Sequence, residues 1–348
     1  MQTTIRLCVQ EAHTYDVIVI GGGTTGFAAA IAAARNGVRT ALVEYNSFLG
    51  GNAANANGLG FLGFHNKQKQ LVVRGIALEM VQRLQSLGGA SEFYFDPITS
   101  DLVAINGNWI KIVMMEMVAE SDVNLYLRSL AFQVQSRNKA LDAIYIVNKQ
   151  GCQELRAKAF VDATDTADIA VMSGADYVVG RERDHKVQVS SYCFRVGNLD
   201  FGEILKYFAE YPDQIRPFNL EKHVLDNLLI QMHSAPFVTG GFTDLVAQAI
   251  EDGIDFPNDR LCGCWYPEER EALIVGSRVE NVDPNNVTEY SQSEKVGQLQ
   301  VKEIMKFIHN YMPGGKNARL VGTGHQIGVR ETRHIVGEYK LTVEDLLQ

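Results

Sequence analysis

The chain has 348 residues, of which 46% are hydrophobic and 21% are charged, a composition typical of globular proteins that fold in water. Its length suggests two domains, or one large domain with an insertion. The net charge of −9 argues against a protein that binds nucleic acid or anionic membranes, and no apolar run is long enough to cross a bilayer. Because residues 1–14 lack the apolar core of a signal peptide, we expect a disordered arm there and a cytoplasmic protein.

The segment from Tyr15 to Glu44 reads YDVIVIGGGTTGFAAAIAAARNGVRTALVE and has the pattern of a βαβ unit. The apolar run at residues 15–20 predicts a strand that is buried on both faces. The alanine-rich stretch that follows predicts a helix ending at Gly37, because glycine commonly follows the last turn of a helix. Residues 38–43 predict the second strand.

Three glycines follow the first predicted strand at the spacing GxGxxG: Gly21, Gly23 and Gly26. In such a motif the first allows a tight turn, the second lets the backbone approach a pyrophosphate, and the third lets helix and strand touch. Glu44 lies 23 positions after Gly21 (44 − 21), where a carboxylate would accept hydrogen bonds from both ribose hydroxyls. The segment therefore predicts a dinucleotide site, although FAD and NAD both use this motif.

Two later segments favour FAD over NAD. Residues 50–64, GGNAANANGLGFLGF, offer backbone N–H groups and side-chain amides to a long polar ligand. An NAD domain would usually continue there with another helix and strand. Further on, residues 158–174 predict a strand, a turn at Asp162-Ala163-Thr164 and a short helix, preceded by two strands of a β-meander at residues 124–135 and 140–148.

These segments resemble the FAD-dependent oxidoreductase family often called FAD_oxidored, of glutathione-reductase-type fold. The resemblance is carried by VIVIGGGTTGFAAAIAAARNGVRTALVE, FLGGNAANANGLGFLGF, RGIALEMVQRL, AKAFVDATDTADIA and IGVRETRHIVGEYKLTVEDLL. It implies an α/β protein with a Rossmann-like FAD-binding domain, made of a parallel sheet plus a β-meander, and a second mixed α+β domain. It also implies redox chemistry at the isoalloxazine ring of FAD.

The motif and the resemblance together predict the residues that bind FAD. They are Gly21, Gly22, Gly23, Thr24, Thr25, Gly26, Glu44, Tyr45, Gly50, Gly51, Asn52, Ala53, Ala131, Ala163 and Thr164. We expect the phosphates at the N-terminus of the first helix, where unpaired N–H groups and the helix dipole favour anions.

The chain departs from the family pattern in two places. Asp165 stands where the family has the glycine of a DATG motif, so the position loses backbone freedom and gains a negative charge near the expected pyrophosphate. Relative to the family, the sequence also ends early, before a segment that returns to the first domain and contacts the flavin. We therefore expect a complementing C-terminal segment or a homo-oligomer as a partner, beside a small-molecule substrate.

Beyond residue 183 the pattern changes to mixed strands and helices. We expect a first domain at residues 1–183, a substrate or cap domain at 184–322, and a return segment at 323–348. Residues 289–312 predict a long amphipathic helix. Its expected core face consists of Val296, Leu299, Ile304, Phe307 and Ile308.

The late motif supplies the candidate catalytic residues Arg330, His325 and Arg333. Arginines could hold a substrate carboxylate in a bidentate way, and a histidine could transfer a proton. The alternative is a structural role in an Arg–Glu ion-pair network at a domain junction. For Arg330 we give the catalytic and the structural role about equal weight, and for His334 we favour the structural role. His65 and Arg278 are weaker candidates.

The five cysteines contain no CxxC pair, and the odd count favours reduced thiols. We expect Cys262 and Cys264 to be buried thiols in a loop, and we expect no metal site. The leading hypothesis is an FAD-dependent oxidoreductase that moves hydride between a small molecule and the flavin. The alternative is a truncated or split family member that binds flavin poorly, and an NAD-dependent dehydrogenase is disfavoured.

Overall fold

The structure is a computed structural model that describes residues 8–58, 60–95, 101–137, 140–216, 221–233, 235–280, 282–283, 285–340, 342 and 344–345. The chain forms two compact units, each built from separate stretches of sequence. The first unit contains Met1–Gly51, Met114–Val187 and Glu331–Gln348, and the second contains Asn52–Val113 and Gln188–Arg330. This division differs from the expected one chiefly in residues 52–113, which group with the second unit.

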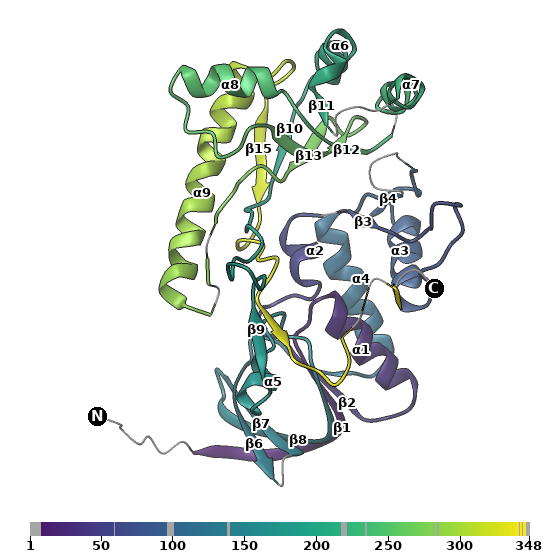
Figure 1. Ribbon diagram of the computed structural model, residues 1–348. Coiled ribbons are helices and arrows are strands. Elements are labelled where there is room, and N and C mark those ends of the chain that lie inside the picture. Colours follow the sequence, from purple (N-terminus) through teal and green to yellow (C-terminus); the bar gives the residue numbers. More distant parts are fainter. Residues whose placement is uncertain are drawn as a thin grey trace. The chain divides into compact units, whose positions relative to one another are not determined.

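The first unit is built on a six-stranded sheet with the strand order β5-β2-β1-β8-β7-β6. The strands are β1 (Val9–Ile20), β2 (Thr40–Val43), β5 (Asn124–Tyr126), β6 (Leu130–Arg137), β7 (Ala140–Asn148) and β8 (Gly151–Asp162). Strands β5, β2, β1 and β8 pair in parallel, and β8, β7 and β6 form an antiparallel meander. Figure 1 shows the purple β1 beside the teal β8, which lies far along the chain. The expected parallel sheet with a β-meander is thus confirmed.

Strand β1 is longer at its start than the sequence suggested. Val9 pairs with Cys152 of β8, so residues 9–14 belong to the strand and not to a disordered arm. The long strand β8 gives them a pairing partner, a contact that the local sequence does not reveal. Residues 1–7 lie outside the described part. The expected single strand at 124–135 is also divided, because Arg128 adopts a left-handed φ of 50° between β5 and β6.

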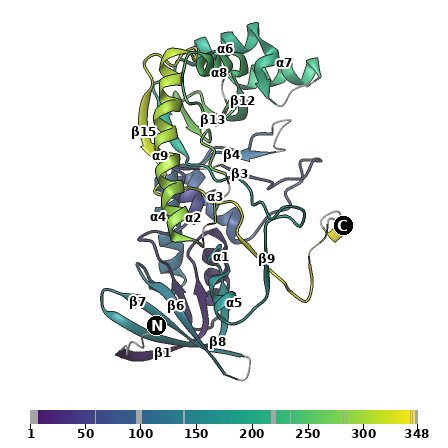
Figure 2. The same cartoon turned by 60° about the vertical axis from the view of Figure 1, so that its left-hand side comes forward.

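The helices of the first unit are α1 (Thr24–Arg35), which contacts β1 and β2, and the short α5 (Asp168–Met172). A two-stranded sheet pairs β9 (Tyr177–Val179) with β16 (Arg333–Ile335). Figure 2 shows β6, β7 and β8 together with β1 in this unit. Its core consists of apolar strand residues that include Ile18, Ile144 and Leu155, each with 0% of its surface exposed.

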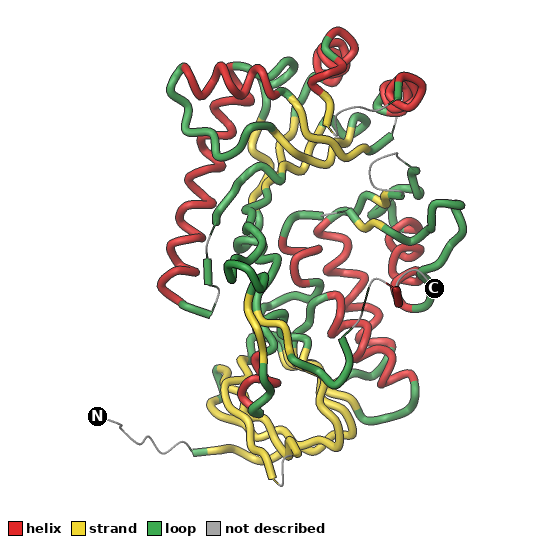
Figure 3. The backbone as a smooth tube through the Cα atoms, in the orientation of Figure 1, coloured by secondary structure: helices red, strands yellow, loops and turns green. Residues whose placement is uncertain are grey.

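The second unit is built on a six-stranded antiparallel sheet with the order β11-β12-β13-β14-β10-β15. The strands are β10 (Phe194–Gly197), β11 (Ile215–Arg216), β12 (Phe237–Gly241), β13 (Leu261–Tyr266), β14 (Glu271–Ile274) and β15 (Arg319–Thr323). Its helices are α6 (Phe201–Glu210), η1 (Pro212–Gln214), α7 (Lys222–Gln231), α8 (Thr243–Glu251) and the long α9 (Val287–Asn310). The alternation of red helices and yellow strands in Figure 3 confirms the expected mixed character of this part.

Residues 52–113 add a smaller group of elements to the second unit. They are α2 (Gly51–Asn55), β3 (Phe61–Leu62), α3 (Ile76–Ser86), β4 (Leu102–Val103) and the start of α4 (Gly107–Glu120). Strands β3 and β4 form a short antiparallel pair. Helices α2 and α4 cross the boundaries between the two units. In the described part of the chain, no helix is long and apolar enough to cross a membrane.

The core of the second unit corrects one expectation for α9. Ile304, Phe307 and Ile308 are buried as expected, but Leu299 is 56% exposed. Its place on the core face is taken by Val301, which is 5% exposed and lies about one turn before Ile304 on the same side of the helix.

Cys262 and Cys264 lie on the central strand β13 and not in a loop. Strand β13 pairs with β12 on one side and β14 on the other. Gly263 between the two cysteines allows this close pairing, because a Cβ there would lie 2.8 Å from the carbonyl oxygen of Leu273. The glycine that suggested a loop therefore serves the sheet.

Candidate functional site

The glycine turn between β1 and α1 has the close contacts that a dinucleotide-binding motif requires. Gly21 adopts a φ of +102°, and a Cβ there would lie 2.0 Å from the carbonyl oxygen of Ala163. A Cβ on Gly26 would lie 1.8 Å from the carbonyl oxygen of Gly21. Side chains at these two positions would collide with backbone, so only glycine allows the first turn of α1 to pack against the strands.

Gly23 differs from Gly21 and Gly26, because a side chain at this position would not collide with other atoms. The nearest atom to a Cβ on Gly23 would be Cα of Gly51, 4.0 Å away. Gly23 is also the N-cap of α1 and has no side chain to accept a hydrogen bond from the first turn, which contains no acidic residue. The start of α1 thus combines donor N–H groups, a positive dipole end and room for a ligand, which together suit a pyrophosphate.

Glu44 lies at the end of β2, beside the glycine turn, and is 7% exposed. Its Oε2 accepts a hydrogen bond from the N–H of Gly22 at 2.5 Å. Its Oε1 accepts from the backbone N–H of Asn46 at 2.6 Å and from Asn46 Nδ2 at 2.8 Å. Since a carboxylate offers about four acceptor positions, one remains, on Oε2. The structure therefore leaves room for one ribose hydroxyl bond where the sequence suggested two.

The loop after Glu44 returns to the glycine turn. The N–H of Gly50 donates to the carbonyl oxygen of Gly22 at 2.9 Å, and a Cβ on Gly51 would lie 3.0 Å from Cα of Gly23. Tyr45 is 65% exposed, whereas Ala53, on α2, is 8% exposed. The backbone bond fixes Gly50 and Gly51 next to the start of α1.

Two further expected residues differ in their exposure. Ala131 is on β6, where it is opposite Ile146 of β7, and with 9% of its surface exposed it packs in the sheet core. Asn52 belongs to α2 and is exposed.

The amides of the asparagine-rich loop were expected to face a ligand, and Asn55 does not. Its Oδ1 accepts from the backbone N–H groups of His325 at 2.6 Å and Gln326 at 3.1 Å, and its Nδ2 donates to the carbonyl oxygen of Gln326 at 3.2 Å. Asn57 behaves differently, because its Nδ2 is buried without a partner among the described residues. A buried donor without a partner costs about 1–3 kcal/mol, so Asn57 is suited to bind an acceptor atom of a ligand.

The turn after β8 brings the DAT segment to the glycine turn. The N–H of Ala163 donates to the carbonyl oxygen of Ile20 at 2.8 Å. Asp162 organises the turn, because its Oδ1 accepts from the N–H and hydroxyl of Thr164 at 3.1 and 2.7 Å. Its Oδ2 accepts from the N–H of Ala170 at 2.8 Å, in α5. The expected residues Ala163 and Thr164 are therefore held beside Gly21.

Asp165, at the position of the family's glycine, has the backbone conformation of a glycine. Its φ is +65°, and aspartate enters this left-handed region more easily than most residues. Nearby protein atoms partly desolvate its carboxyl, and the charges of Glu44 and Asp162 repel its charge, so the pKa of Asp165 is raised. The substitution thus preserves the turn and adds a repelled carboxyl group to it.

The late motif braces this same turn. The hydroxyl of Thr332 donates to the carbonyl oxygen of Asp165 at 2.9 Å. Arg333 Nη1 donates to the carbonyl oxygen of Thr166 at 3.0 Å and to Oδ1 of Asp168 at 2.8 Å. Arg333, expected as a catalytic residue, is thus engaged in holding the turn, and no local pattern in the sequence pairs these segments. We refer to Thr332 and Arg333 as the brace.

The other candidates of the late motif lie in different surroundings. Arg330 is exposed, and its Nη2 donates to the hydroxyl of Ser191 at 3.0 Å. His334 pairs with Glu331 at 2.9 Å, and Arg278 pairs with Glu280 at 2.8 Å; both pairs lie at the surface. Surface pairs of this kind contribute little stability.

His325 lies beside a lysine that the sequence did not single out. Its Nε2 is 3.2 Å from Nζ of Lys111, on α4. Burial lowers the pKa of His325, and the charge of Lys111 lowers it further. Burial also lowers the pKa of Lys111. A neutral His325 ring accepts a hydrogen bond from the Lys111 ammonium, so the pair carries one positive charge.

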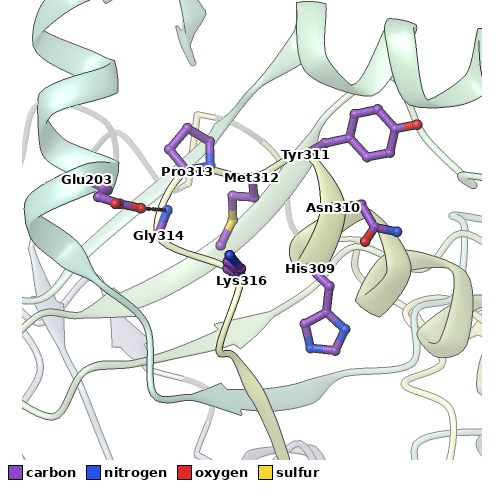
Figure 4. Close-up of a pocket in the computed structure, with 8 residues that line it drawn as sticks. All are labelled: Glu203, His309, Asn310, Tyr311, Met312, Pro313, Gly314 and Lys316. Carbon is purple, nitrogen blue, oxygen red and sulfur yellow. Dashed lines mark hydrogen bonds between the residues drawn. The ribbon is translucent and has the colours of Figure 1, made fainter.

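Two open hollows mark the surface of the second unit. One, of about 660 Å³, is lined by residues at the end of α9 and by Glu203 of α6. Figure 4 shows Glu203 directed toward Gly314, whose N–H donates to the carboxylate at 2.8 Å. The other, of about 700 Å³, lies along α9 and β15 and includes Tyr192, Lys302 and Leu320. Neither hollow is lined by an expected FAD-binding residue.

Comparison with known proteins supports a flavin-binding fold. The chain resembles a p-nitrophenol 4-monooxygenase from Pseudomonas putida, with a TM-score of 0.53, 12% identity, and coverage of 94% of this chain and 71% of that one. It also resembles the myxobacterial FAD-dependent chondrochloren halogenase, with a TM-score of 0.51, 13% identity, and coverage of 94% and 66%. At these identities the likeness shows the fold alone.

Sequence comparison gives the family. A soluble pyridine nucleotide transhydrogenase of Chromohalobacter salexigens is 26% identical over 152 residues, which is 44% of this chain and 31% of that protein. The chain spans less than a third of the length of the curated relatives that it matches. The model of one family, described as FAD dependent oxidoreductase, matches residues 16–348. The chain therefore belongs to the FAD-dependent oxidoreductase family, whose cofactor is FAD.

Proposed function

We propose that this chain is an oxidoreductase that binds FAD at the glycine turn and moves hydride between a small molecule and the flavin. The observation that carries the proposal is the start of α1, which has no side-chain cap and faces space at Gly23. A tight turn without a ligand would not need glycine at position 23, because its φ of −64° suits any residue. Room for a pyrophosphate explains that glycine.

The remaining contacts follow from the same turn. Gly23, Thr24 and Thr25 would bind the pyrophosphate through their N–H groups, and Glu44 would accept one hydrogen bond from the adenosine ribose. The backbone of Ala163 and Thr164, held by Asp162, would line the adjoining part of the cofactor. When bound, FAD supplies an acceptor for hydride, and the protein supplies orientation and electrostatics.

A titration with FAD tests the proposal. Flavin fluorescence should show saturable binding of FAD to the purified chain. Gly23→Val should weaken binding at least about tenfold, because a charged phosphate loses hydrogen bonds worth roughly 1.5–3 kcal/mol each. Thr288→Val, in the exposed first turn of α9, places the same side chain at another helix start and should bind FAD as the wild type does.

The outcomes separate two levels of the proposal. Unchanged affinity in a folded Gly23→Val variant would contradict the phosphate assignment alone. Absence of saturable FAD binding by the wild-type chain would contradict the function itself, and would favour the alternative of a family member that binds flavin poorly. Repulsion by the carboxyl of Asp165 would contribute to such weak binding. Glu44→Gln should weaken FAD about tenfold and leave FMN nearly unaffected, since FMN lacks the adenosine ribose. Equal losses for both flavins would refute the ribose contact.

A further inference from the structure

The large sheet of the second unit has a free edge at β15. Strand β15 is last in the strand order, and among the described residues it pairs only with β10. Most of the strand is exposed to solvent, including the apolar side chains of Leu320, at 48%, and Val321, at 56%. The free edge of an exposed strand presents unpaired backbone N–H and C=O groups, which can pair with another extended chain.

A hollow of about 700 Å³ lies beside this edge and is lined by residues of both β15 and α9. Figure 2 shows β15 next to α9 in the second unit. The apolar side chains of Val301, Met305 and Leu320 line the hollow, together with the ring of Tyr192. We refer to this hollow and the free edge of β15 together as the edge groove.

The fold holds Tyr192 firmly in the edge groove. Its hydroxyl donates to the carbonyl oxygen of Gly324 at 2.7 Å. Gly297 lies inside α9, and a Cβ there would lie 2.9 Å from Cβ of Tyr192. Glycine is a poor helix former, but at this position it lets the tyrosine pack closely against the helix. The groove is therefore already shaped before any partner binds.

Positive charge gathers around the edge groove. Lys302 on α9 and Arg319 on β15 are exposed, and neither forms an ion pair with another described residue. Two nearby carboxylates are each held by a cation, in the pairs Lys306–Glu303 and Arg195–Glu271. The whole chain, in contrast, has a net charge of −9. The local charge therefore complements an acidic partner and would repel a basic one.

We propose that the edge groove binds an extended segment of a partner protein that carries both apolar and acidic side chains. The segment would add a strand to β15 through backbone hydrogen bonds and place an apolar side chain in the hollow. Its acidic side chains would meet the charge of Lys302 and Arg319. A second copy of the chain fits this groove less well, because a two-fold dimer would bring the same positive patch of both copies together. The flavin takes no part in this interaction, so the inference goes beyond the proposed function.

The first test measures binding of a synthetic peptide to the full chain by fluorescence anisotropy. The probe is a fluorescein-labelled peptide in which glutamate and valine alternate, and the wild-type chain should bind it in a saturable way. The same peptide with lysine in place of glutamate should bind at least about tenfold more weakly, because the charges then repel. A wild-type chain that binds neither peptide, or binds both equally, would overturn the proposal.

Variants of the chain locate the binding site. Lys302→Glu should weaken binding of the glutamate–valine peptide about tenfold. Lys206→Glu is the matched control, because it makes the same charge change at a lysine on α6 that is 75% exposed, and it should bind as the wild type does. Equal affinities of the two variants would show that the peptide does not bind in the groove.

The hollow itself is tested at Leu320. Leu320→Ser should weaken binding about tenfold, because an apolar contact is lost. Val287→Ser removes another exposed apolar side chain, at the first position of α9, and should leave binding unchanged. Both residues are exposed, so both variants should keep the fold, as circular dichroism would verify. Unchanged binding by Leu320→Ser would contradict the role of the hollow.

Methylated peptides test the added strand. In an extended chain, the N–H groups of successive residues point to opposite edges. One peptide is methylated on the valine nitrogens and the other on the glutamate nitrogens, so only one of them loses the N–H groups that face β15. That peptide should bind at least about tenfold more weakly than the other. Equal affinities of the two would contradict strand addition.

Sedimentation of the chain without peptide tests the second copy as the occupant. The wild-type chain should show no association that depends on the edge groove. A wild-type dimer that Leu320→Ser dissociates would place a second copy on this edge and would overturn the proposal. Flavin titrations of Lys302→Glu and Leu320→Ser should match the wild type, so failure of this inference is distinct from failure of the proposed function.

Discussion

The glycine turn of the first unit and the Asn55 loop of the second unit are both small, polar stretches near the start of the chain, but they are fixed differently. Most contacts that close the glycine turn join residues near one another in sequence, Gly26 with Gly21 and Glu44 with Gly22, and the DAT turn at Ala163 completes it from far along the chain. Asn55 is held by residues 270 and 271 positions away. A motif describes the first kind of site well, whereas composition alone misleads about the second, because it does not show which partner an amide will find.

The largest expected effect separates two glycines of one motif. Gly26→Ala places a Cβ 1.8 Å from a backbone oxygen, so we expect a loss of about 3 kcal/mol in the free energy of unfolding. Gly23→Ala meets no atom closer than 4.0 Å, so its stability should change by less than about 1 kcal/mol while its FAD affinity falls. Urea unfolding followed by circular dichroism measures both variants. Equal stability of the two would refute the division of roles between these glycines.

A second prediction concerns the brace. Arg333→Ala removes hydrogen bonds from a charged donor to Thr166 and Asp168 and should cost about 2 kcal/mol. Arg278→Ala breaks an exposed pair with Glu280 and should cost less than about 1 kcal/mol. If Arg333 acts by positioning, any lost activity should return when FAD is supplied in excess. Activity that stays absent in a folded, flavin-loaded Arg333→Ala protein would restore the catalytic role expected from the sequence.

Substitution of Asp165 should change the free energy of unfolding by a smaller amount, and this change should depend on pH. Because folding raises the pKa of this carboxyl above its ordinary value of 3.8, its stabilising contribution is fully present below that value and is lost as the pH rises through the folded pKa. Asp165→Asn should therefore gain stability relative to wild type as the pH rises from acid to neutral. Asp165→Gly should gain about 1 kcal/mol more at all pH values, because it also relieves the left-handed backbone. Unfolding curves at several pH values that coincide for wild type and Asp165→Asn would contradict the repulsion.

The smallest effect is a change in titration. Lys111→Met removes the neighbouring charge that lowers the pKa of His325, so that pKa should rise. It should not return fully to its ordinary value, because burial is the larger cause and persists. NMR titration of the His325 ring measures the shift, and Lys302→Met on α9 serves as the control. An unchanged or lower pKa in Lys111→Met would show that the two side chains do not interact in solution.

The sequence predicted the first unit well where the signals were local. The strand, glycine turn and helix of residues 15–35 have their expected order, because a buried apolar strand and a glycine turn depend on neighbours in the chain. The β-meander was also recognised. The pairing of residues 9–14 with β8 was missed, since that contact depends on a strand that comes far later in the chain.

The site was predictable to a lesser extent. Glu44 was singled out, but its bonds to Gly22 and Asn46, which set how many further hydrogen bonds its carboxylate can accept, were not predicted. Thr332 was missed because nothing in a local pattern pairs it with Asp165, 167 positions earlier. His65 was seen without its hydrogen-bond partner Asp101, 36 positions later, for the same reason. The tertiary fold determines which side chains far apart in sequence contact each other, and the hydrophobic periodicity of the sequence does not indicate these contacts.

The position of the brace has a consequence for synthesis on the ribosome. Thr332 and Arg333 leave the ribosome only after residues 188–330 of the second unit have been made. During that interval the DAT turn and the residues after it, which include Asp165 and Ala167 with left-handed φ values, lack the hydrogen bonds of the brace. Since domains generally fold as units during translation, the second unit can complete its fold first, and the DAT turn becomes rigid last. Cofactor capture would then be a late step in the maturation of this protein.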